Sequence, residues 1–551
     1  MKKLFLINCR QPLIDAFVSL GCEVCCIRSY DNELDVSSKL NELGFKPDLI
    51  FQQEILGLRL FLSGMHKIDC IKIFWSVDTH LNMHWHGVYG SLFDGVLTTQ
   101  KKYVPILKKN CEAEICWIPW MGARLGIQSG TTGGLIPYSS RSHSLTFVGR
   151  VTKARPSRLW FIKFLNSHFD LHQVEDLNYS QMMEVYRQTR IVPNEAIFGE
   201  INFRIFEACS CGCAVVTPDI GEELGELFDI GKEIIVYRDV LELKEILSRL
   251  QADPSYAASL GLAGYERIMR DHLPVNRAKS ILDFVKRISK RKVDIDDAQL
   301  YANLACASLG ESGGMTVEWG NLINKLLACK MGVMRDAALF RLSVRADLRE
   351  LYLLIAKPYF EKKIFPKNCY FNMIASLCAV HLGLNDLALK WWFSYVSAVY
   401  DQKKNKPKDT LELLMFWGDE LFKNGITLRP GVAFNEASDI PSCAADCYFA
   451  ALYIDPKNLA VFKRLDLIFA DVMGGEPTRL GFLSQLSLHH PRDWHICADI
   501  GITNLKVFRL TEGLNDLDFA RNLAIEAGRE RFFKRKVLSD LPSYFRLVYN
   551  D

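Results

Sequence analysis

The chain has 551 residues, of which 49% are hydrophobic and 24% charged, and its formal net charge at pH 7 is +3. This length is too great for one hydrophobic core and predicts about three domains. The near-neutral charge excludes the strong positive field of a typical nucleic-acid-binding protein, and no apolar run approaches the roughly 20 residues of a transmembrane helix. The 17 cysteines lie in apolar segments, as free thiols do in a reducing compartment. We therefore expect a cytoplasmic protein with no membrane span and no nucleic-acid partner.

Residues 1–125 alternate short apolar runs with amphipathic segments, which is the pattern of βαβ units. The expected strands cover 3–8, 23–27, 48–52, 71–75, 95–98 and 115–118. The intervals between them leave room for crossover helices. This part of the sequence predicts a Rossmann-like domain with a parallel sheet.

A second α/β series occupies residues 143–290. It follows the segment 124–144, which is rich in Gly, Ser and Thr and is typical of an interdomain linker. The expected strands cover 145–148, 169–173, 214–217 and 233–237, and the expected helices cover 159–167, 181–188, 240–250 and 254–271. The pattern predicts a second Rossmann-like domain.

Residues 294–551 lack strand patterns and show helical spacing throughout. The sequence GLNDL occurs at 383–387 and again at 513–517, and both copies are expected to be turns between helices. The segment 444–456 is similar to the second helix of a tetratricopeptide repeat. These landmarks are not spaced by multiples of about 34 residues, so a repeat array and a plain helical domain both remain open.

The segment 197–219 is the strongest candidate for chemistry. Asn202 is expected to cap a helix that runs to Ser210, Gly212 to end it, and a buried strand to follow. A helix that starts at the mouth of a parallel sheet points its N–H groups at the site, where they favour a diphosphate. Arg204 adds a positive charge there, and the carboxylate of Glu207 suits a ribose diol.

The motif Arg204-x-Phe206-Glu207-Ala-x-x-x-Gly212 resembles the signature motif of the CgeB-like glycosyltransferases, relatives of glycosyltransferase family 4. The resemblance covers roughly residues 70–285. It implies a GT-B fold, in which two Rossmann-like domains face a cleft, and a nucleotide-sugar donor bound mainly by the second domain. It also implies that Glu207 binds the nucleotide ribose. The family's sugar-binding Glu corresponds to Gly199, with Glu200 out of register, so the sugar is not predicted.

A second element of the resemblance is the strand and turn that contain Gly149, Arg150 and Lys153. It is similar to the family's GRxxxKG element, whose cations neutralise the β-phosphate of the leaving nucleotide. The spacing here is one residue shorter, which makes Arg150 the firmer candidate. Arg155 and Arg158 are competing donors.

A third element is the sequence Trp75-Ser76-x-Asp78, which follows a buried strand. An inverting transfer needs a base near the acceptor hydroxyl, and we expect Asp78 to be that base, with His80 as second candidate. His80, His84 and His86 form a cluster without a known metal-ligand spacing. The resemblance to two-Rossmann glycosyltransferases implies no metal cofactor, because in such enzymes the helix dipole and cations stabilise the leaving diphosphate.

The sequence therefore predicts a bacterial glycosyltransferase that uses a nucleotide-sugar donor. We expect its helical domain to present a protein acceptor, such as a surface or flagellar protein. Two alternatives stay open at this point. One is a glycan or cell-wall polysaccharide acceptor, and the other is an inactive scaffold that binds protein partners.

Overall fold

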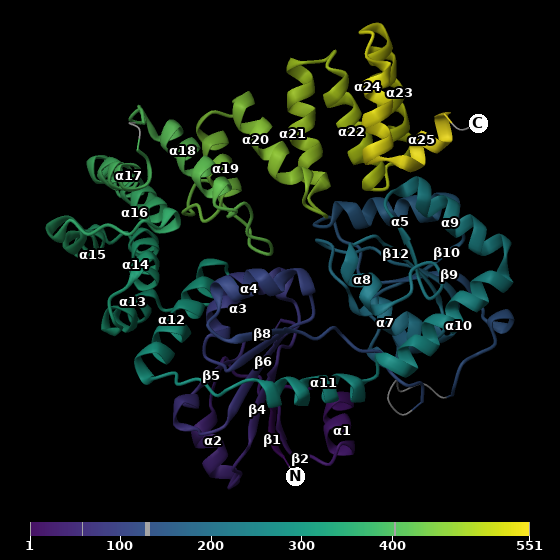
Figure 1. The fold of residues 1–551 in the computed structure, drawn as a ribbon, viewed down its shortest axis with the longest axis horizontal. Helices are drawn as coiled ribbons and strands as arrows, with labels where there is room; N and C mark the ends of the chain where they lie inside the picture. The colour runs from purple at the N-terminus through teal and green to yellow at the C-terminus, as the bar shows by residue number, and fades with distance from the viewer. Residues whose placement is uncertain (1, 58, 127–132, 402–403, 550–551) are drawn as a thin grey trace.

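The computed structural model describes residues 2–57, 59–126, 133–401 and 404–549. They form two α/β domains followed by an all-α domain, which confirms the expected fold class (Figure 1). Each α/β domain is built on one parallel sheet, as in Rossmann-like folds. Residues 127–132 of the expected linker lie outside the described part of the chain.

The first sheet has the strand order β2-β1-β4-β6-β7-β8, and all neighbouring strands are parallel. Its strands are β1 (Lys3–Ile7), β2 (Glu23–Ile27), β4 (Leu49–Gln53), β6 (Ile71–Ser76), β7 (Gly95–Thr98) and β8 (Glu114–Trp117). A small second sheet pairs β3 (Glu33–Asp35) with β5 (Phe61–Ser63). The chain order of the large sheet reverses between β1 and β4. In such sheets ligands bind beyond the carboxyl ends of the strands at that reversal.

Helices cover both faces of the first sheet because its strands are apolar on both sides. Leu4 and Leu6 of β1 pack with α1 (Gln11–Ser19). Phe5 and Ile7 pack on the opposite face with α2 (Val36–Leu43) and α3 (Thr79–Gly90). Helix α4 (Val104–Asn110) precedes β8 and packs against it. The buried strands thus hold their carboxyl ends at one edge of the domain.

The second sheet has the order β10-β9-β11-β12-β13, again parallel throughout. Its strands are β9 (His143–Val148), β10 (Leu171–Val174), β11 (Thr189–Pro193), β12 (Ala214–Pro218) and β13 (Ile235–Tyr237). Its helices are α5 (Pro156–His168), α6 (Tyr179–Arg187), α7 (Phe203–Ser210), α8 (Glu222–Leu227), α9 (Val240–Ala252) and α10 (Pro254–Asp271). The sequence reading omitted β11, which follows α6 almost directly and ends at a proline. The chain order reverses between β9 and β11.

Helix α11 (Pro274–Arg287) leaves the second domain and packs on the first. Arg277 donates from Nε to the carbonyl oxygens of Pro119 and Trp120, at 2.8 Å each. A Cβ on Gly95 would lie 2.6 Å from the ring of Phe284, so the helix approaches the sheet closely at that point. Helix α11 therefore packs as part of the first domain, although its residues lie within the range 143–290 predicted for the second domain.

The all-α domain begins after residue 294. Its helices are α12 (Ile295–Glu311), α13 (Trp319–Ala328), α14 (Val333–Arg345), α15 (Arg349–Lys362), α16 (Cys369–His381), α17 (Asn385–Val399), α18 (Thr410–Lys423), α19 (Ala444–Ile454), α20 (Leu459–Ala470), α21 (Glu476–His489), α22 (Trp494–Lys506), α23 (Leu510–Glu526), α24 (Glu530–Asp540) and α25 (Pro542–Tyr549). No helix in the described part of the chain is long and apolar enough to cross a membrane.

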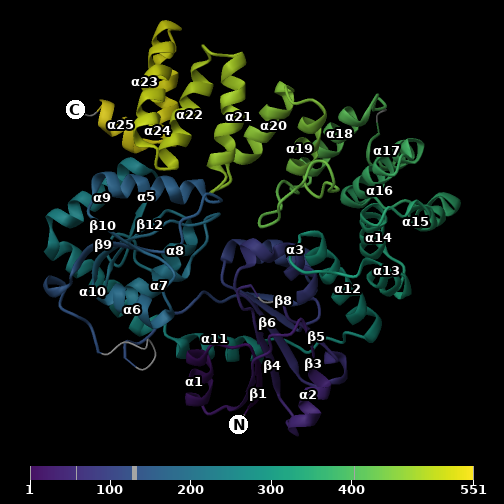
Figure 2. The same ribbon diagram turned by 180° about the vertical axis from the view of Figure 1, so that it is seen from behind.

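These helices form an arc that joins the two α/β domains (Figures 1 and 2). The arc begins on the first domain, where α12 packs on α3 and Ser308 donates to the carbonyl oxygen of His84 at 2.8 Å. It ends on the second domain, where the ring centroids of Phe508 and Phe161 are 4.8 Å apart. Ser543 donates to the carboxylate of Asp239 at 2.6 Å. Both ends of the all-α domain are thus anchored.

The two GLNDL segments adopt different structures. The first is a turn between α16 and α17, where Gly383 has a φ of +70°. The second lies inside α23, so the expected turn at 513–517 is wrong. A Cβ on Gly513 would lie 2.6 Å from the side chain of Leu505, and one on Gly501 would lie 3.1 Å from the carbonyl oxygen of Gly513. This glycine is required by the close packing of α22 on α23 and not by a turn.

Candidate functional site

The carboxyl ends of β9 and β11 position the candidate donor site of the second domain. The turn after β9 contains Gly149, which has a φ of +153°. A Cβ at this position would lie 2.9 Å from the guanidinium of Arg204. The glycine therefore lets the turn approach the first turn of α7. This contact lies where the strand order reverses, as expected for a site in a parallel sheet.

Arg204 joins α7 to the ends of both strands. Its Nη2 donates to the carbonyl oxygen of Val148 at 2.8 Å, and its Nη1 donates to Oδ1 of Asn194 at 2.6 Å. Its guanidinium also lies 4.3 Å from the ring centroid of Phe147. These contacts occupy most of the donors of Arg204, so its main effect is to orient the start of α7.

Asn202 precedes α7 at the expected N-cap position, but its side chain does not cap the helix. Its amide instead donates to Asn194 Oδ1 at 3.0 Å and to the carbonyl oxygen of Glu195 at 3.1 Å. The N–H groups of the first turn of α7 therefore have no side-chain cap. A helix N-terminus in this state favours a bound anion.

A cavity of about 560 Å³ lies at this N-terminus. The described residues that line it are Val148, Gly149, Arg150, Arg158, Asp176, Leu177, Asn178, Met182, Tyr186, Glu200, Asn202, Phe203, Arg204 and Glu207. Five of the six donor-site residues predicted from sequence thus share one cavity. The sixth, Lys153, lies in the exposed turn before α5 and is not among the lining residues.

Glu207 is 8% exposed and accepts no hydrogen bond from the described residues of the protein. Burial raises the pKa of its carboxyl group to about 7, although the charges of Arg10 and Arg204 act in the opposite direction. A buried carboxyl group that accepts no hydrogen bond destabilises the folded protein, and such groups are common at ligand-binding sites.

Besides Arg204, two arginines bring positive charge to the cavity. Arg150 forms an exposed ion pair with Asp176. Arg158 is buried and pairs with Glu195, with 2.7 Å between its Nη2 and Oε2 of Glu195. Of the competing cations in the sequence, Arg158 is thus the one that reaches the cavity together with Arg150.

Glu200 also lines the cavity and lies two residues before Asn202. It is 6% exposed, and its Oε2 has no hydrogen-bond partner among the described residues. Burial and the neighbouring Glu195 raise the pKa of Glu200 to about 8, against the effects of Arg158 and Lys102. The carboxyl group is therefore largely protonated near pH 7 and suits uncharged hydroxyl groups.

On the first domain, Glu54 organises the carboxyl ends of β4 and β6. Its Oε2 accepts from the backbone N–H groups of Val77 and Asp78, at 2.7 and 2.8 Å, and its Oε1 accepts from Asn82 at 2.7 Å. Burial acts to raise the pKa of Glu54, but the adjacent His86 and these N–H donors hold it below the usual range. The sequence reading missed this residue because nothing local to position 54 indicates a site.

Asp78 lies at the start of α3, where its side chain does not cap the helix. Burial and the negative charge of Glu54 raise its pKa to about 7, while Arg59 and Arg10 lower it. A carboxyl group with this pKa exchanges its proton near neutral pH. Asp78 is therefore a candidate for a general base.

The three histidines after Asp78 have different surroundings. His86 is within hydrogen-bond distance of Ser76 Oγ, at 2.7 Å, whereas His84 lies 3.2 Å from Ser312 in the all-α domain. His80 is buried, and its Nδ1 has no partner in the described part of the chain. Burial lowers the pKa of His80 to about 4, so the imidazole is neutral at pH 7. Among the described residues, no three His, Cys, Asp or Glu side chains are arranged to hold a metal ion.

Arg10 links the two halves of the site. It follows β1, and its guanidinium lies 4.9 Å from the ring centroid of Trp120 and 5.6 Å from that of Phe203. Its charge lowers the pKa of both Asp78 and Glu207, so it lies near residues of both domains. The sequence offered no motif that marks Arg10.

Hydrogen bonds join the first domain to the loop before α7. The side-chain amide of Gln100 donates to the carbonyl oxygen of Ile201 at 3.1 Å and accepts from its N–H at 2.9 Å. Nζ of Lys102 donates to the carbonyl oxygens of Phe198 and Gly199, at 2.6 and 2.8 Å. The carboxyl ends of the two sheets therefore face each other, and hydrogen bonds join the two domains there.

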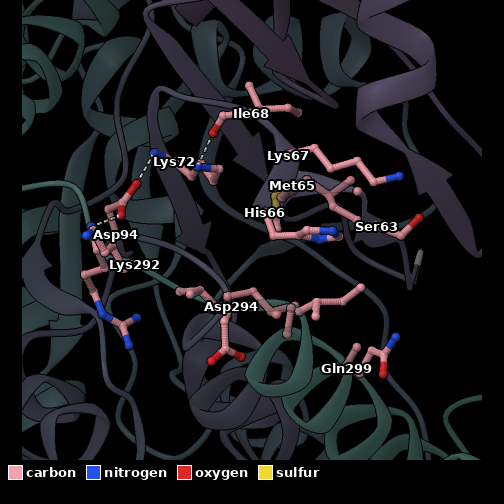
Figure 3. A pocket seen from close by; sticks show the side chains of 18 of the residues that line it. Ser63, Met65, His66, Lys67, Ile68, Lys72, Asp94, Lys292, Asp294 and Gln299 are labelled. Atoms are coloured by element: carbon pink, nitrogen blue, oxygen red, sulfur yellow. Dashed lines mark hydrogen bonds between the residues drawn. The ribbon is translucent and has the colours of Figure 1, made fainter.

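A cavity of about 600 Å³ lies elsewhere, between the turn Met65–Lys67 and the start of α12 (Figure 3). Some of its polar groups pair with one another. Lys72 donates from Nζ to the carbonyl oxygens of Ile68 and Cys70, and Asp94 accepts from the backbone N–H of Lys72. Lys72 lies near the start of β6, at the amino end of the sheet, which is opposite to the edge that builds sites.

Three solved structures resemble about half of the chain. A sucrose-phosphate synthase from Thermosynechococcus elongatus is 12% identical, with 52% of this chain and 99% of that chain covered and a TM-score of 0.40. An α-glucosyltransferase in complex with UDP and a 13-mer DNA is 10% identical, with 52% and 99% covered and a TM-score of 0.38. The pneumococcal O-GlcNAc transferase GtfA, in complex with UDP and GlcNAc, is 9% identical, with 46% and 59% covered and a TM-score of 0.31.

No curated protein matches the chain in sequence. Residues 145–283 match a protein-family model described as glycosyl transferase-like. The matched region contains every residue that lines the 560 Å³ cavity, including Glu200 and Glu207. The chain thus contains a glycosyl transferase-like domain over residues 145–283.

Proposed function

We propose that the chain transfers a sugar from a nucleotide-sugar donor to an acceptor hydroxyl, with the nucleoside diphosphate held in the cavity at α7. The carboxyl group of Glu207 carries this proposal, because it is buried, lines the cavity and accepts no hydrogen bond from the described residues. A ribose presents two adjacent hydroxyl donors that such a carboxylate accepts. The UDP bound in two of the similar structures is a ligand of this kind.

The diphosphate would lie over the uncapped N-terminus of α7. Arg150 and Arg158 line the same cavity and supply positive charge as negative charge develops on the leaving group. Arg204 holds the helix in place for this interaction. We propose that these groups suffice without a resident metal ion, and transfer that persists at full rate in excess EDTA would support this.

The acceptor hydroxyl would approach from the first domain. In an inverting transfer, the carboxylate of Asp78 takes the hydroxyl proton while the oxygen bonds to the anomeric carbon. The bond from that carbon to the diphosphate breaks, and the leaving group keeps the electron pair. His80, whose Nδ1 is buried and unpartnered within the described chain, is the second candidate for this proton transfer.

We propose that the acceptor is a protein, such as a bacterial surface or flagellar protein, presented by the all-α domain. The arc of helices supports this proposal, because it spans from the acceptor-side domain to the donor-side domain (Figure 1). A tetratricopeptide-like arc binds extended peptides along its inner face. We further propose that the chain is CgeB-like, on the motif from Arg204 to Gly212.

Nucleotide release from a panel of nucleotide sugars, with peptide and glycan acceptors supplied separately, tests the proposal. We expect release from one donor and faster release with a peptide acceptor. Faster release only with glycans would assign a polysaccharide acceptor instead. An absence of both release and nucleotide binding would contradict the proposal and favour a scaffold.

A further inference from the structure

The loop Ile197–Ile201 has an unusual backbone. Phe198 has a φ of +53° and Gly199 a φ of +64°, so two consecutive residues adopt the left-handed conformation. This conformation is unfavourable for Phe198, and it persists only where surrounding contacts hold it. The loop immediately precedes α7 and contains Glu200, which lines the candidate donor cavity.

The all-α domain supplies part of these contacts. The loop Asp471–Gly475 connects α20 to α21 and packs on the strained pair. A Cβ on Gly199 would lie 2.7 Å from Sδ of Met473. A Cβ on Gly474, whose φ is +83°, would lie 2.8 Å from the backbone nitrogen of Phe198. Glycines on both sides thus permit an approach that side chains would block.

The first domain holds the same loop from another side. Lys102 donates from Nζ to the carbonyl oxygens of Phe198 and Gly199, and it would lie 3.1 Å from a Cβ at Gly199. All three domains therefore meet at the Phe198–Gly199 pair. A shift of the Asp471–Gly475 loop would remove contacts that hold this pair. It would thereby change the direction of the Glu200 side chain, which follows the pair.

We propose that the loop Asp471–Gly475 is a working part of the donor site, in which Met473 and Gly474 are positioning residues that aim the buried Glu200 carboxyl at the sugar hydroxyls of the donor. This inference rests on the proposed function and extends it. The all-α domain then acts on the donor as well as on the acceptor. The unpartnered Oε2 of Glu200 is the atom that the sugar contacts.

The test compares two affinities measured by titration calorimetry for each variant. One is for a nucleoside diphosphate and the other is for the matching nucleotide sugar. We expect Met473→Ala to leave the diphosphate affinity within about twofold and to weaken nucleotide-sugar affinity about 10-fold, the effect of losing a hydrogen bond or two. Glu200→Ala, which removes the carboxyl group, should reproduce this selective loss, whereas Met473→Leu, which conserves volume, should retain nucleotide-sugar affinity.

A double-mutant cycle adds a readout that general destabilisation would not produce. Gly199→Ala introduces a Cβ against Met473, so Met473→Ala should relieve part of its effect on nucleotide-sugar affinity. Additive effects, or an unchanged ratio of the two affinities in Met473→Ala, would overturn the inference. If the unmodified protein binds no nucleoside diphosphate, the proposed function itself fails, which is a distinct outcome.

Discussion

Glu207 is a position at which ligand binding and stability should respond in opposite directions. The substitution Glu207→Gln keeps the shape of the side chain and removes its charge. In the folded protein, burial raises the pKa from an ordinary 4.5 to about 7. This difference corresponds to about 3 kcal/mol between the two protonation states.

The sign of the effect on stability follows from the direction of the pKa change. The folded state holds the Glu207 proton more tightly than the unfolded state. The stabilisation that protonated Glu207 gives the folded state is therefore complete below pH 4.5 and is lost as the pH rises through 7. The Gln variant has no such loss. Between pH 4.5 and pH 8, its free energy of unfolding relative to that of the unmodified protein should therefore increase by about 3 kcal/mol. For a domain of 150 to 250 residues this raises the unfolding midpoint by roughly 6 to 12 °C.

Nucleotide binding should weaken in the same variant. Hydrogen bonds to a charged group contribute about 1.5–3 kcal/mol each, so losing the charge should weaken nucleoside diphosphate binding by roughly 10-fold or more. Thermal unfolding at pH 4.5 and pH 8 and titration calorimetry at pH 8 measure the two effects. A variant that is less stable at pH 8 and binds nucleotide normally would refute the reasoning, because Glu207 would then be structural.

Three further predictions concern the first domain and the helix packing. Asp78→Asn should leave nucleotide affinity unchanged and lower turnover by about 10²-fold or more, and normal turnover of the variant would exclude Asp78 as the base. In the unmodified enzyme, turnover should rise with pH up to about 7 as Asp78 ionises. Glu54→Gln removes a charge that raises the pKa of Asp78, so the rise in turnover should move to lower pH, and an unmoved profile would contradict this link. Gly513→Ala, which places a Cβ 2.6 Å from Leu505, should destabilise the protein by roughly 1–3 kcal/mol in denaturant unfolding. Gly481→Ala in α21, which faces open space, should stabilise it by up to about 1 kcal/mol, and equal effects of the two would refute the packing argument.

The segment from Asn202 to Pro218 was predictable because its signals are local. A polar residue precedes the apolar spacing of a helix, Gly212 ends it, and a run of small and β-branched residues forms the strand. Asn202 shows the limit of such signals. Its position was predicted, but its side chain binds Asn194 and Glu195, which only the fold of β11 brings within reach.

Arg10 and Glu54 could not be found from sequence, because nothing near either residue marks a site. They come together because β1 and β4 are neighbours in the sheet although β2 and β3 lie between them in the chain. The repeated GLNDL sequence makes the same point for helices. Gly383 ends a helix with a positive φ, whereas Gly513 lets two helices pack closely, and the identical local sequence cannot distinguish these roles.

A crystal structure with a bound nucleoside diphosphate tests the central claim most directly. We expect the ribose hydroxyls within hydrogen-bond distance of the Glu207 carboxylate and the diphosphate over the N-terminus of α7, between Arg150 and Arg158. A nucleotide bound in the cavity beside Met65, or anywhere away from Glu207, would contradict the account.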